Sequence, residues 1–390
     1  MVMTAEYLDE ESLPRRRWVT WNEYDGRVST LRLGFGFLFD YGTYSQDATS
    51  KQQVTMSPEV GLRDFRFVVG GRFKTERPAS WTLGYMYDDA EKSWLFRLTG
   101  IDIGVPELKG RVFIGRTKEG YSMVKLMNGY NPWGMERSPV QDAFMPILAD
   151  GVRWRSYFEQ PRLFFSLAYF NDLISDNEKF ATYDNQVVAR VAWQPVLSEA
   201  EGKLFHIGVM GRGGEPDEDK MQFRARPEAS MAPFFVDTGK FPVDRAGTTG
   251  FEAYYRAGPW LFGTEYNWQA VDATTGHDPV LHGGDVVATW LITGETRPYN
   301  AAAAIFEAIS PTRTVFEGGP GAFEAVLRLS YTDFDSGSFH GGRFWRLTPM
   351  VNWHLSYNVR LEAVYGFGIL DRFDLEGETQ FFQSRLQLRL

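Results

Sequence analysis

This chain of 390 residues contains pairs of arginines two positions apart, and their type and spacing suit the binding of anions. Arg153 and Arg155 form one such pair, and Arg224 and Arg226 form another. A guanidinium group offers a planar fork of donors that fits phosphate or carboxylate oxygens. Because rings of Arg or Lys in a pore select anions, the pattern predicts anion binding in a channel.

Residues 27–41 indicate what kind of element carries such arginines. Almost every second side chain there is apolar or aromatic, while the positions between include Arg32 and Asp40. Successive side chains of a strand point to opposite faces, so one face of this segment is apolar and the other polar. No run of 18 apolar residues predicts a transmembrane helix. The alternation recurs to the last residue and predicts a membrane-spanning β-barrel with a cationic lumen.

The cost of placing a charge in lipid decides which face of each strand points inward. In residues 152–158, one register directs Val152, Trp154 and Phe158 outward and both arginines inward. The opposite register would place two arginines in hydrocarbon, at a cost of about 4–8 kcal/mol. The same test directs inward Arg32, Arg66, Arg72, Arg97, Arg190, Arg224, Arg226, Arg256, Arg328 and Arg346. Fewer acids share that face, namely Asp40, Asp64, Glu252, Glu265, Glu324 and Glu362. For any single arginine, the alternative is a pairing with an acid that only holds the shape of the barrel.

Seventeen segments alternate well enough to be candidate strands. They are residues 28–44, 59–75, 78–88, 91–103, 109–118, 150–158, 161–172, 185–195, 203–213, 219–227, 248–257, 259–270, 284–293, 322–335, 343–355, 358–371 and 379–390. Single-chain bacterial barrels have an even number of strands, so one candidate is wrong or one strand is missed. The weakest candidates are 78–88 and 219–227.

No linker or change in composition divides the chain. We therefore predict one barrel domain over residues 27–390, preceded by a polar N-terminal segment, residues 1–26. Three longer polar segments are expected to face outward or to fold into the pore: 119–149, 228–247 and 294–320. Ala301–Ile309 could form a short helix. The N-terminal segment lacks the apolar core of a signal peptide, and because an outer-membrane barrel must be exported, we infer that the signal was removed.

The remaining composition argues against other functions. A net charge of −9 disfavours a nucleic-acid partner, and the absence of cysteine removes thiol chemistry and disulfides. The five histidines show no metal-binding spacing, so no metal, cofactor or catalytic site is predicted. Asn352 and His354 share a strand face, as alternation alone requires, and no enzyme activity is expected from them. A calcium site in Glu215–Asp219 is a weaker interpretation than a solvated loop.

Several stretches, taken in their order along the chain, resemble one family of bacterial outer-membrane proteins. The stretches are Gly61–Gly71 (GLRDFRFVVGG), Gly110–Lys118 (GRVFIGRTK), Met135–Ser138, Gly151–Val152, Trp290–Tyr299 (WLITGETRPY), Gly321–Glu324, Arg328–Tyr331, Asn352–Leu355 and Asn358–Leu361. In this order and spacing they are similar to the phosphate-selective porin O and P family, from about residue 30 to 390. The resemblance implies an all-β, transmembrane antiparallel barrel of 16 strands, with 18 as the alternative, whose third loop, here 119–149, folds inward. It also implies a homotrimer in the bacterial cell outer membrane, in contact with lipid and lipopolysaccharide.

The resemblance further implies which residues bind anions or line the pore. They are Arg63 and Arg66, Arg153 and Arg155, Arg224 and Arg226, with Arg32 and Arg256, and Lys125 and Arg137 in the third loop. Strict alternation places Arg63 on the outward face, whereas the resemblance places it in the pore.

The expected function is passive diffusion of small anions, with phosphate or polyphosphate as the leading substrates. One alternative is a nonselective or organic-solute porin on the same barrel, because the third loop is rich in aromatic residues and methionine. A second alternative is a structural barrel that anchors an envelope complex. A soluble lectin-like β protein is disfavoured by the apolar outward faces.

Overall fold

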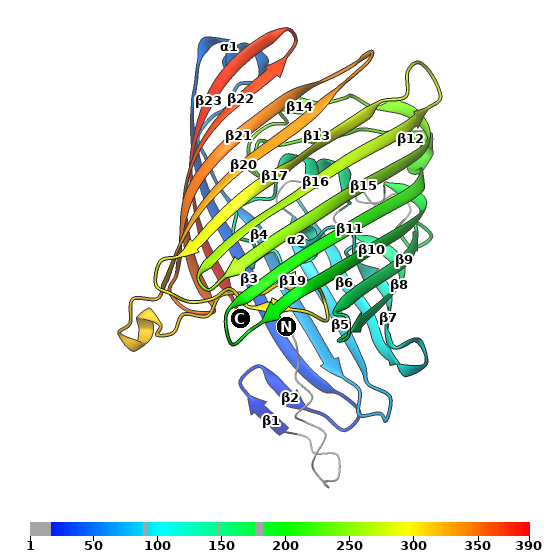
Figure 1. Ribbon diagram of the computed structural model, residues 1–390, viewed down its shortest axis with the longest axis vertical. Coiled ribbons are helices and arrows are strands. Elements are labelled where there is room, and N and C mark those ends of the chain that lie inside the picture. Colours follow the sequence, from blue (N-terminus) through cyan, green and yellow to red (C-terminus); the bar gives the residue numbers. More distant parts are fainter. Residues whose placement is uncertain (1–16, 89–91, 147, 176–181) are drawn as a thin grey trace.

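The structure, a computed structural model, describes residues 17–88, 92–146, 148–175 and 182–390. Sixteen antiparallel strands close into one barrel because the last strand pairs with the first, for example at Arg385 and Asp40 (Figure 1). The strands are β3 (Thr30–Gln46), β4 (Glu59–Arg72), β5 (Ala79–Asp88), β6 (Ser93–Val105), β7 (Gly110–Thr117), β8 (Ala149–Phe158), β9 (Leu163–Asn171), β10 (Tyr183–Ser198), β11 (Lys203–Pro216), β15 (Phe241–Ala257), β16 (Trp260–Ala273), β17 (Val280–Leu291), β20 (Ala322–Ser336), β21 (Phe339–His354), β22 (Val359–Arg372) and β23 (Leu375–Arg389). The predicted all-β antiparallel barrel is confirmed, with 16 strands rather than 18.

Short elements lie outside or inside this wall. The helices are α1 (Ala48–Gln53), α2 (Met123–Leu126) and α3 (Pro139–Phe144), with 3-10 turns η1 (Pro106–Leu108), η2 (Asp217–Asp219) and η3 (Val315–Glu317). The short strands are β1 (Arg17–Thr20), β2 (Glu23–Asp25), β12 (Lys220–Met221), β13 (Arg224–Ala225), β14 (Val236–Asp237), β18 (Tyr299–Asn300) and β19 (Ile305–Phe306). β2 pairs with β3 and with β1, which hangs below the barrel in Figure 1. None of the helices in the described residues is both long and apolar enough to cross a membrane.

One of the seventeen candidate strands is wrong. Residues 219–227 contribute only β12 and β13, and both belong to the connection between β11 and β15. The alternation there is real, since Phe223 and Ala225 are buried and Arg224 is exposed, but it serves a hairpin packed inside the barrel. The helix predicted over Ala301–Ile309 is also absent, because β19 pairs there with β18.

The two faces of the wall follow the predicted register. On the outside, Val152 is 44% exposed and Leu167 is 50% exposed, as lipid-facing side chains must be. On the inside, Arg153 and Asp40 are buried. The outward apolar faces and inward charges therefore agree with the cost of placing charge in hydrocarbon.

Arg63 is an exception that a β-bulge explains. Leu38 of β3 pairs with Asp64, but the next residue, Phe39, pairs with Leu62. Arg63 is the extra residue in β4, and a bulge of this kind redirects a side chain that strict alternation would send to the other face. The outward placement of Arg63 predicted from alternation is wrong, because its guanidinium lies inside, beside Glu136.

Three connections fold into the lumen. We call the end with α1 in Figure 1 the upper rim and the end with the C-terminus the lower rim. The third loop (residues 118–148) and the upper segment (217–240) enter from the upper rim. The part of the lower segment (292–321) that contains β18 and β19 enters from the lower rim, whereas η3 lies outside the barrel. Met123, Met127 and Val140 of the third loop have no exposed surface. The inward-folded third loop is therefore confirmed.

The interior carries an apolar core where a polar lumen was predicted. Trp133 of the third loop lies 6.1 Å, between ring centroids, from Phe306 of the lower segment and 5.6 Å from Tyr254 of β15. Nearer the upper rim, Phe144 of α3 lies 5.8 Å from Phe223 of the upper segment. Because these packed rings occupy the β10–β22 side of the barrel, the polar space is displaced toward β3–β6.

Candidate functional site

A cavity of about 640 Å³ lies between the β3–β6 wall, the third loop and the upper segment. Six of the predicted site residues line it: Arg63, Arg66, Lys125, Arg137, Arg224 and Arg226. Lys92, Arg97, Lys118 and Arg385 bring the lining basic residues to ten. The five lining acids are Glu59, Asp64, Glu136, Asp142 and Glu228. The cavity is thus cationic although the whole chain is acidic, and a charge excess of this sign concentrates anions.

The floor of the cavity is an ion-pair cluster around Glu136. Its carboxylate lies 3.1 Å from Nε of Arg63 and also contacts Arg385. Arg385 in turn lies 2.6 Å from Asp40, which is fully buried in the next strand. Burial alone would raise the pKa of the Glu136 carboxyl, but the two guanidinium groups lower that pKa to about 2. Glu136 is therefore ionised and holds the third loop against the β4 and β23 walls.

Arg66 is paired on the wall and stacked on the third loop. Its Nε donates to Asp64 Oδ1 at 2.9 Å, and Asp64 lies 3.7 Å from Arg97. The guanidinium carbon of Arg66 lies 4.6 Å from the centroid of the Tyr130 ring. Gly36 makes this packing possible, since a Cβ there would lie 2.7 Å from the Tyr130 hydroxyl. The wall and the third loop therefore approach closely beside Arg66.

The third loop contributes its own cations. Lys118 Nζ donates to the Met127 carbonyl at 2.6 Å, and Lys125 Nζ lies 2.9 Å from Asp142. Burial lowers the pKa of both ammonium groups, and the nearby Arg137 lowers them further, although Asp142 partly offsets this for Lys125. Arg137 donates through Nε to a loop carbonyl, while its buried Nη2 has no hydrogen-bond partner in the described chain.

The upper segment places two arginines on one aromatic ring. The guanidinium carbons of Arg224 and Arg226 lie 4.2 and 4.4 Å from the centroid of Phe234. The sequence pattern assigned this pair to the barrel wall, but they lie at β13 of the inward hairpin. Arg226 also donates to the Ala232 carbonyl. Arg224 is exposed and makes no hydrogen bond or ion pair with any described residue.

Four predicted site residues lie away from the cavity lining. Arg32 is exposed at the lower end of β3, opposite Glu23 of β2. Arg153 donates to the Lys118 carbonyl at 2.9 Å, at the root of the third loop. Arg155 forms an ion pair with Asp102 on β6.

Arg256, the fourth, is fully buried at the lower rim. It donates to the Arg297 carbonyl of the lower segment at 2.6 Å and lies 2.8 Å from Glu199. Like Arg153, it holds an inward-folded connection rather than facing the cavity.

Other buried wall arginines also hold the inward segments through backbone carbonyls. Arg190 donates to Ala304 at 2.6 Å, and Arg360 donates to Pro132 at 2.8 Å. Arg328 donates to Glu136 O at 2.8 Å. A guanidinium offers several donors, so one group can pair with an acid and still bind a carbonyl. Sequence reasoning missed this role because nothing local shows which arginine meets a distant loop.

The inward acids Glu252 and Glu265 receive the start of α2. Val124 N donates to Glu265 at 2.9 Å, Ser122 Oγ donates to the same carboxyl group at 2.6 Å, and Met123 N donates to Glu252 at 3.1 Å. Free N–H groups at a helix start need such acceptors. These acids therefore anchor the third loop to β15 and β16, far from the cavity-lining strands.

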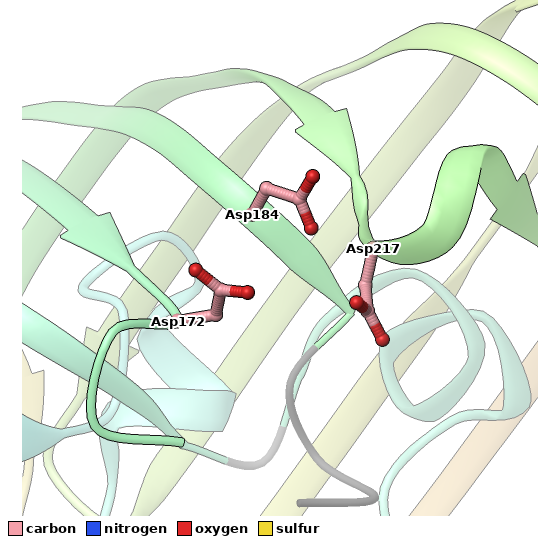
Figure 2. Close-up of side chains that lie close together, drawn as sticks. All are labelled: Asp172, Asp184 and Asp217. Atoms are coloured by element: carbon pink, nitrogen blue, oxygen red, sulfur yellow. The ribbon is translucent and has the colours of Figure 1, made fainter. Parts of the chain in front are cut away.

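Two further polar features lie outside the cavity, a contact of Asn352 with the third loop and a cluster of three aspartates. Asn352 Nδ2 donates to the Trp133 carbonyl at 2.8 Å, so Asn352 anchors the third loop. Figure 2 shows Asp172, Asp184 and Asp217 close together near the upper rim, with carboxylate oxygens within 4.8 Å of one another. Carboxylates so arranged could hold a hard cation, and one of them lies in the Glu215–Asp219 segment.

Comparisons with known proteins agree with this architecture. Residues 31–389 match the family described as phosphate-selective porin O and P. A protein of Caulobacter vibrioides, described as uncharacterized, is 28% identical over 147 residues, which span 35% of this chain and 29% of that protein. The chain thus matches less than a third of the length of that relative.

Solved structures show the same fold at low identity. A loop-deletion mutant of OmpT, an outer membrane protein of Vibrio cholerae, has a TM-score of 0.57 and 11% identity over 93% of this chain and all of that one. An anion-selective porin from Comamonas acidovorans has a TM-score of 0.55 and 11% identity, with the same coverage.

The closed barrel, whose fold the solved structures share, and the family match together define the class of protein, an outer-membrane porin. Because the family match covers nearly the whole barrel, the chain belongs to the phosphate-selective porin O and P family.

Proposed function

We propose that this porin conducts small anions passively through the cationic cavity, with phosphate and short polyphosphate as substrates. The single observation that carries the proposal is the lining itself, in which ten basic residues face five acids. The family description and the similar fold of the anion-selective porin from Comamonas acidovorans support the same function. We also propose a homotrimer embedded in outer-membrane lipid and lipopolysaccharide, which chemical crosslinking in native membranes tests.

In the proposed mechanism, a permeating anion binds weakly to one lining cation after another. An anion entering from the upper rim would meet Arg224 first and then Arg137 and Lys118 along the third loop. Each offers donors that replace part of the lost hydration shell. Several acids already pair with the lining cations, so the excess charge attracts an anion without holding it too tightly to leave.

The deciding experiment is a planar-bilayer measurement on the purified, full-length porin. In a tenfold gradient of KCl, the reversal potential should have the sign of a chloride-permeable pore. Added phosphate should reduce the chloride current in a saturable manner. A reversal potential of the potassium sign would contradict the proposal.

One specific observation favours a second candidate, a barrel that serves as a structural anchor. Three connections fill much of the lumen, and aromatic side chains pack across it at Trp133 and Phe306. If the purified porin inserts into bilayers but carries no current, the anchoring role is favoured over conduction.

A further inference from the structure

The cavity lining contains an aromatic side chain that makes cation–π contacts with two arginines. We call Arg224, Arg226 and Phe234 the Arg–Phe stack. The phenyl ring of Phe234 is partly exposed and belongs to the cavity wall. Guanidinium planes stack favourably on aromatic faces and can carry a second ring on their free side. The stack is therefore a surface that offers both apolar contact and hydrogen-bond donors.

Apolar side chains also face this cavity from its other walls. Leu38 and Met86 come from β3 and β5, Met135 from the third loop, and Met231 from the upper segment. An inorganic oxyanion gains nothing from such neighbours, because it has no apolar surface to bury. Methionine adapts its shape and makes favourable contacts with aromatic rings. The mixed lining thus suits an anion that carries an apolar group.

The size of the cavity supports the same conclusion. Its volume of about 640 Å³ falls within the range of roughly 300–1,000 Å³ found for pockets that hold organic ligands. Since a water molecule takes roughly 30 Å³ in the liquid, the space corresponds to about twenty waters. A tetrahedral oxyanion of five heavy atoms would leave most of that space to solvent.

The hydrogen-bond donors within the cavity are unevenly available. Arg63, Arg66 and Lys125 each face an acid, so their charge is largely matched. Arg224 has no such partner among the described residues, and its donors lie beside the ring of Phe234. At Arg224, available donors and the aromatic surface therefore coincide.

Resting on the proposed anion channel, we propose that the Arg–Phe stack is a binding site for organic anions whose charged group is attached to an aromatic ring. Aryl phosphates and aryl carboxylates have this chemistry. The ring of such a ligand extends the stack, and its oxygens accept hydrogen bonds from Arg224. The preferred substrate class is accordingly aryl anions, with inorganic phosphate as a weaker ligand of the same cavity.

The test compares three esters as blockers of chloride current in bilayers. Phenyl phosphate, cyclohexyl phosphate and methyl phosphate carry the same charged group and differ only in the attached group. For the unmodified porin, phenyl phosphate should reach half-block at a concentration about three- to tenfold below that of cyclohexyl phosphate, the range that aromatic pairing supplies. Cyclohexyl phosphate should in turn block at a lower concentration than methyl phosphate, because it gains the apolar contacts but not the aromatic stacking.

Two variants test whether the preference for phenyl phosphate depends on Phe234. Phe234→Leu keeps apolar volume but removes the ring, so the preference for phenyl over cyclohexyl phosphate should fall to within about twofold. Phe316→Leu is the matched control, because Phe316 is 70% exposed on η3 at the lower rim and does not line the cavity. That control should keep the full preference.

The outcomes separate the inference from the proposed function. If the pore is anion-selective but the three esters block equally, the aryl site is refuted and the anion channel survives. If cyclohexyl phosphate blocks as well as phenyl phosphate, the stack is not the cause. A preference that persists in Phe234→Leu also refutes the site. A pore without anion selectivity removes both proposals together.

Discussion

The sharpest perturbation of the cavity is the double substitution Arg224→Gln and Arg226→Gln. It removes two positive charges from the inward hairpin, one exposed and one partly exposed, and glutamine keeps part of the length and polarity. Arg224 makes no hydrogen bond or ion pair with the described chain, so its loss leaves no buried partner behind. The hairpin itself is held elsewhere, for instance by Arg372, which donates to the Phe235 carbonyl.

The magnitude follows from exposure and distance. Two unit charges 4 Å apart interact by about 1 kcal/mol in water and about 4 kcal/mol in a partly shielded site. Arg224 is exposed and Arg226 is partly exposed, so we take the lower figure of about 1 kcal/mol for each arginine. If the two effects add, phosphate binding weakens by about 2 kcal/mol, or roughly thirtyfold. Neighbouring side chains seldom add fully, so we expect a tenfold to thirtyfold higher half-blocking concentration.

The assay is phosphate block of chloride current at two ionic strengths. Screening shortens the reach of exposed charges, so the difference between the variant and the unmodified porin should shrink in 1 M KCl. The control is Arg77→Gln with Arg313→Gln, which removes two exposed arginines outside the cavity lining. An unchanged half-blocking concentration in the Arg224 and Arg226 variant, or an equal rise in the control, would refute the reasoning.

Three further predictions concern charge, loop anchoring and pH. Glu136→Gln removes a lining acid that neutralises Arg63, so the permeability of chloride relative to potassium should rise about twofold in bilayer recordings; a fall would contradict this charge balance. Arg190→Met leaves the buried Glu252 without its cation, and should lower the free energy of unfolding in detergent by about 3–5 kcal/mol while leaving selectivity unchanged; an unaltered urea midpoint would refute the anchoring role. Burial, and the cations nearby, lower the pKa of Lys118 well below 10.5, so its ammonium charge is lost at a lower pH than that of an exposed lysine. Anion selectivity should therefore decline as the pH is raised toward 10.5, and Lys118→Arg should abolish that decline; an equal decline in both proteins would contradict the assignment to Lys118.

Much of the wall was predictable because strand alternation is a local property. In residues 152–158, apolar residues alternate with arginines. The cost of placing charge in hydrocarbon allows only the register in which the arginines face inward. The same rule found all sixteen wall strands. It failed at 219–227, because a hairpin packed on an interior core also alternates between a buried and an exposed side.

The candidate site was only partly predictable. Arg66 faces the cavity as alternation requires, whereas Arg63 reaches it only through a bulge that no local pattern announces. Arg153 and Arg256 carry the same sequence signal as cavity arginines, yet they hold inward-folded connections. What separates the two groups is whether a backbone carbonyl from a distant segment meets the guanidinium.

The sequence by itself determined a closed barrel with an apolar exterior and a surplus of inward arginine. It could do so because a strand needs only its own neighbours to define two faces. Only the tertiary structure decided which arginines line the cavity and which hold the inward-folded loops. That choice depends on contacts between residues more than a hundred positions apart, such as Arg385 with Glu136 and Arg360 with Pro132. It also depends on the aromatic packing that confines the polar space to the β3–β6 side of the lumen.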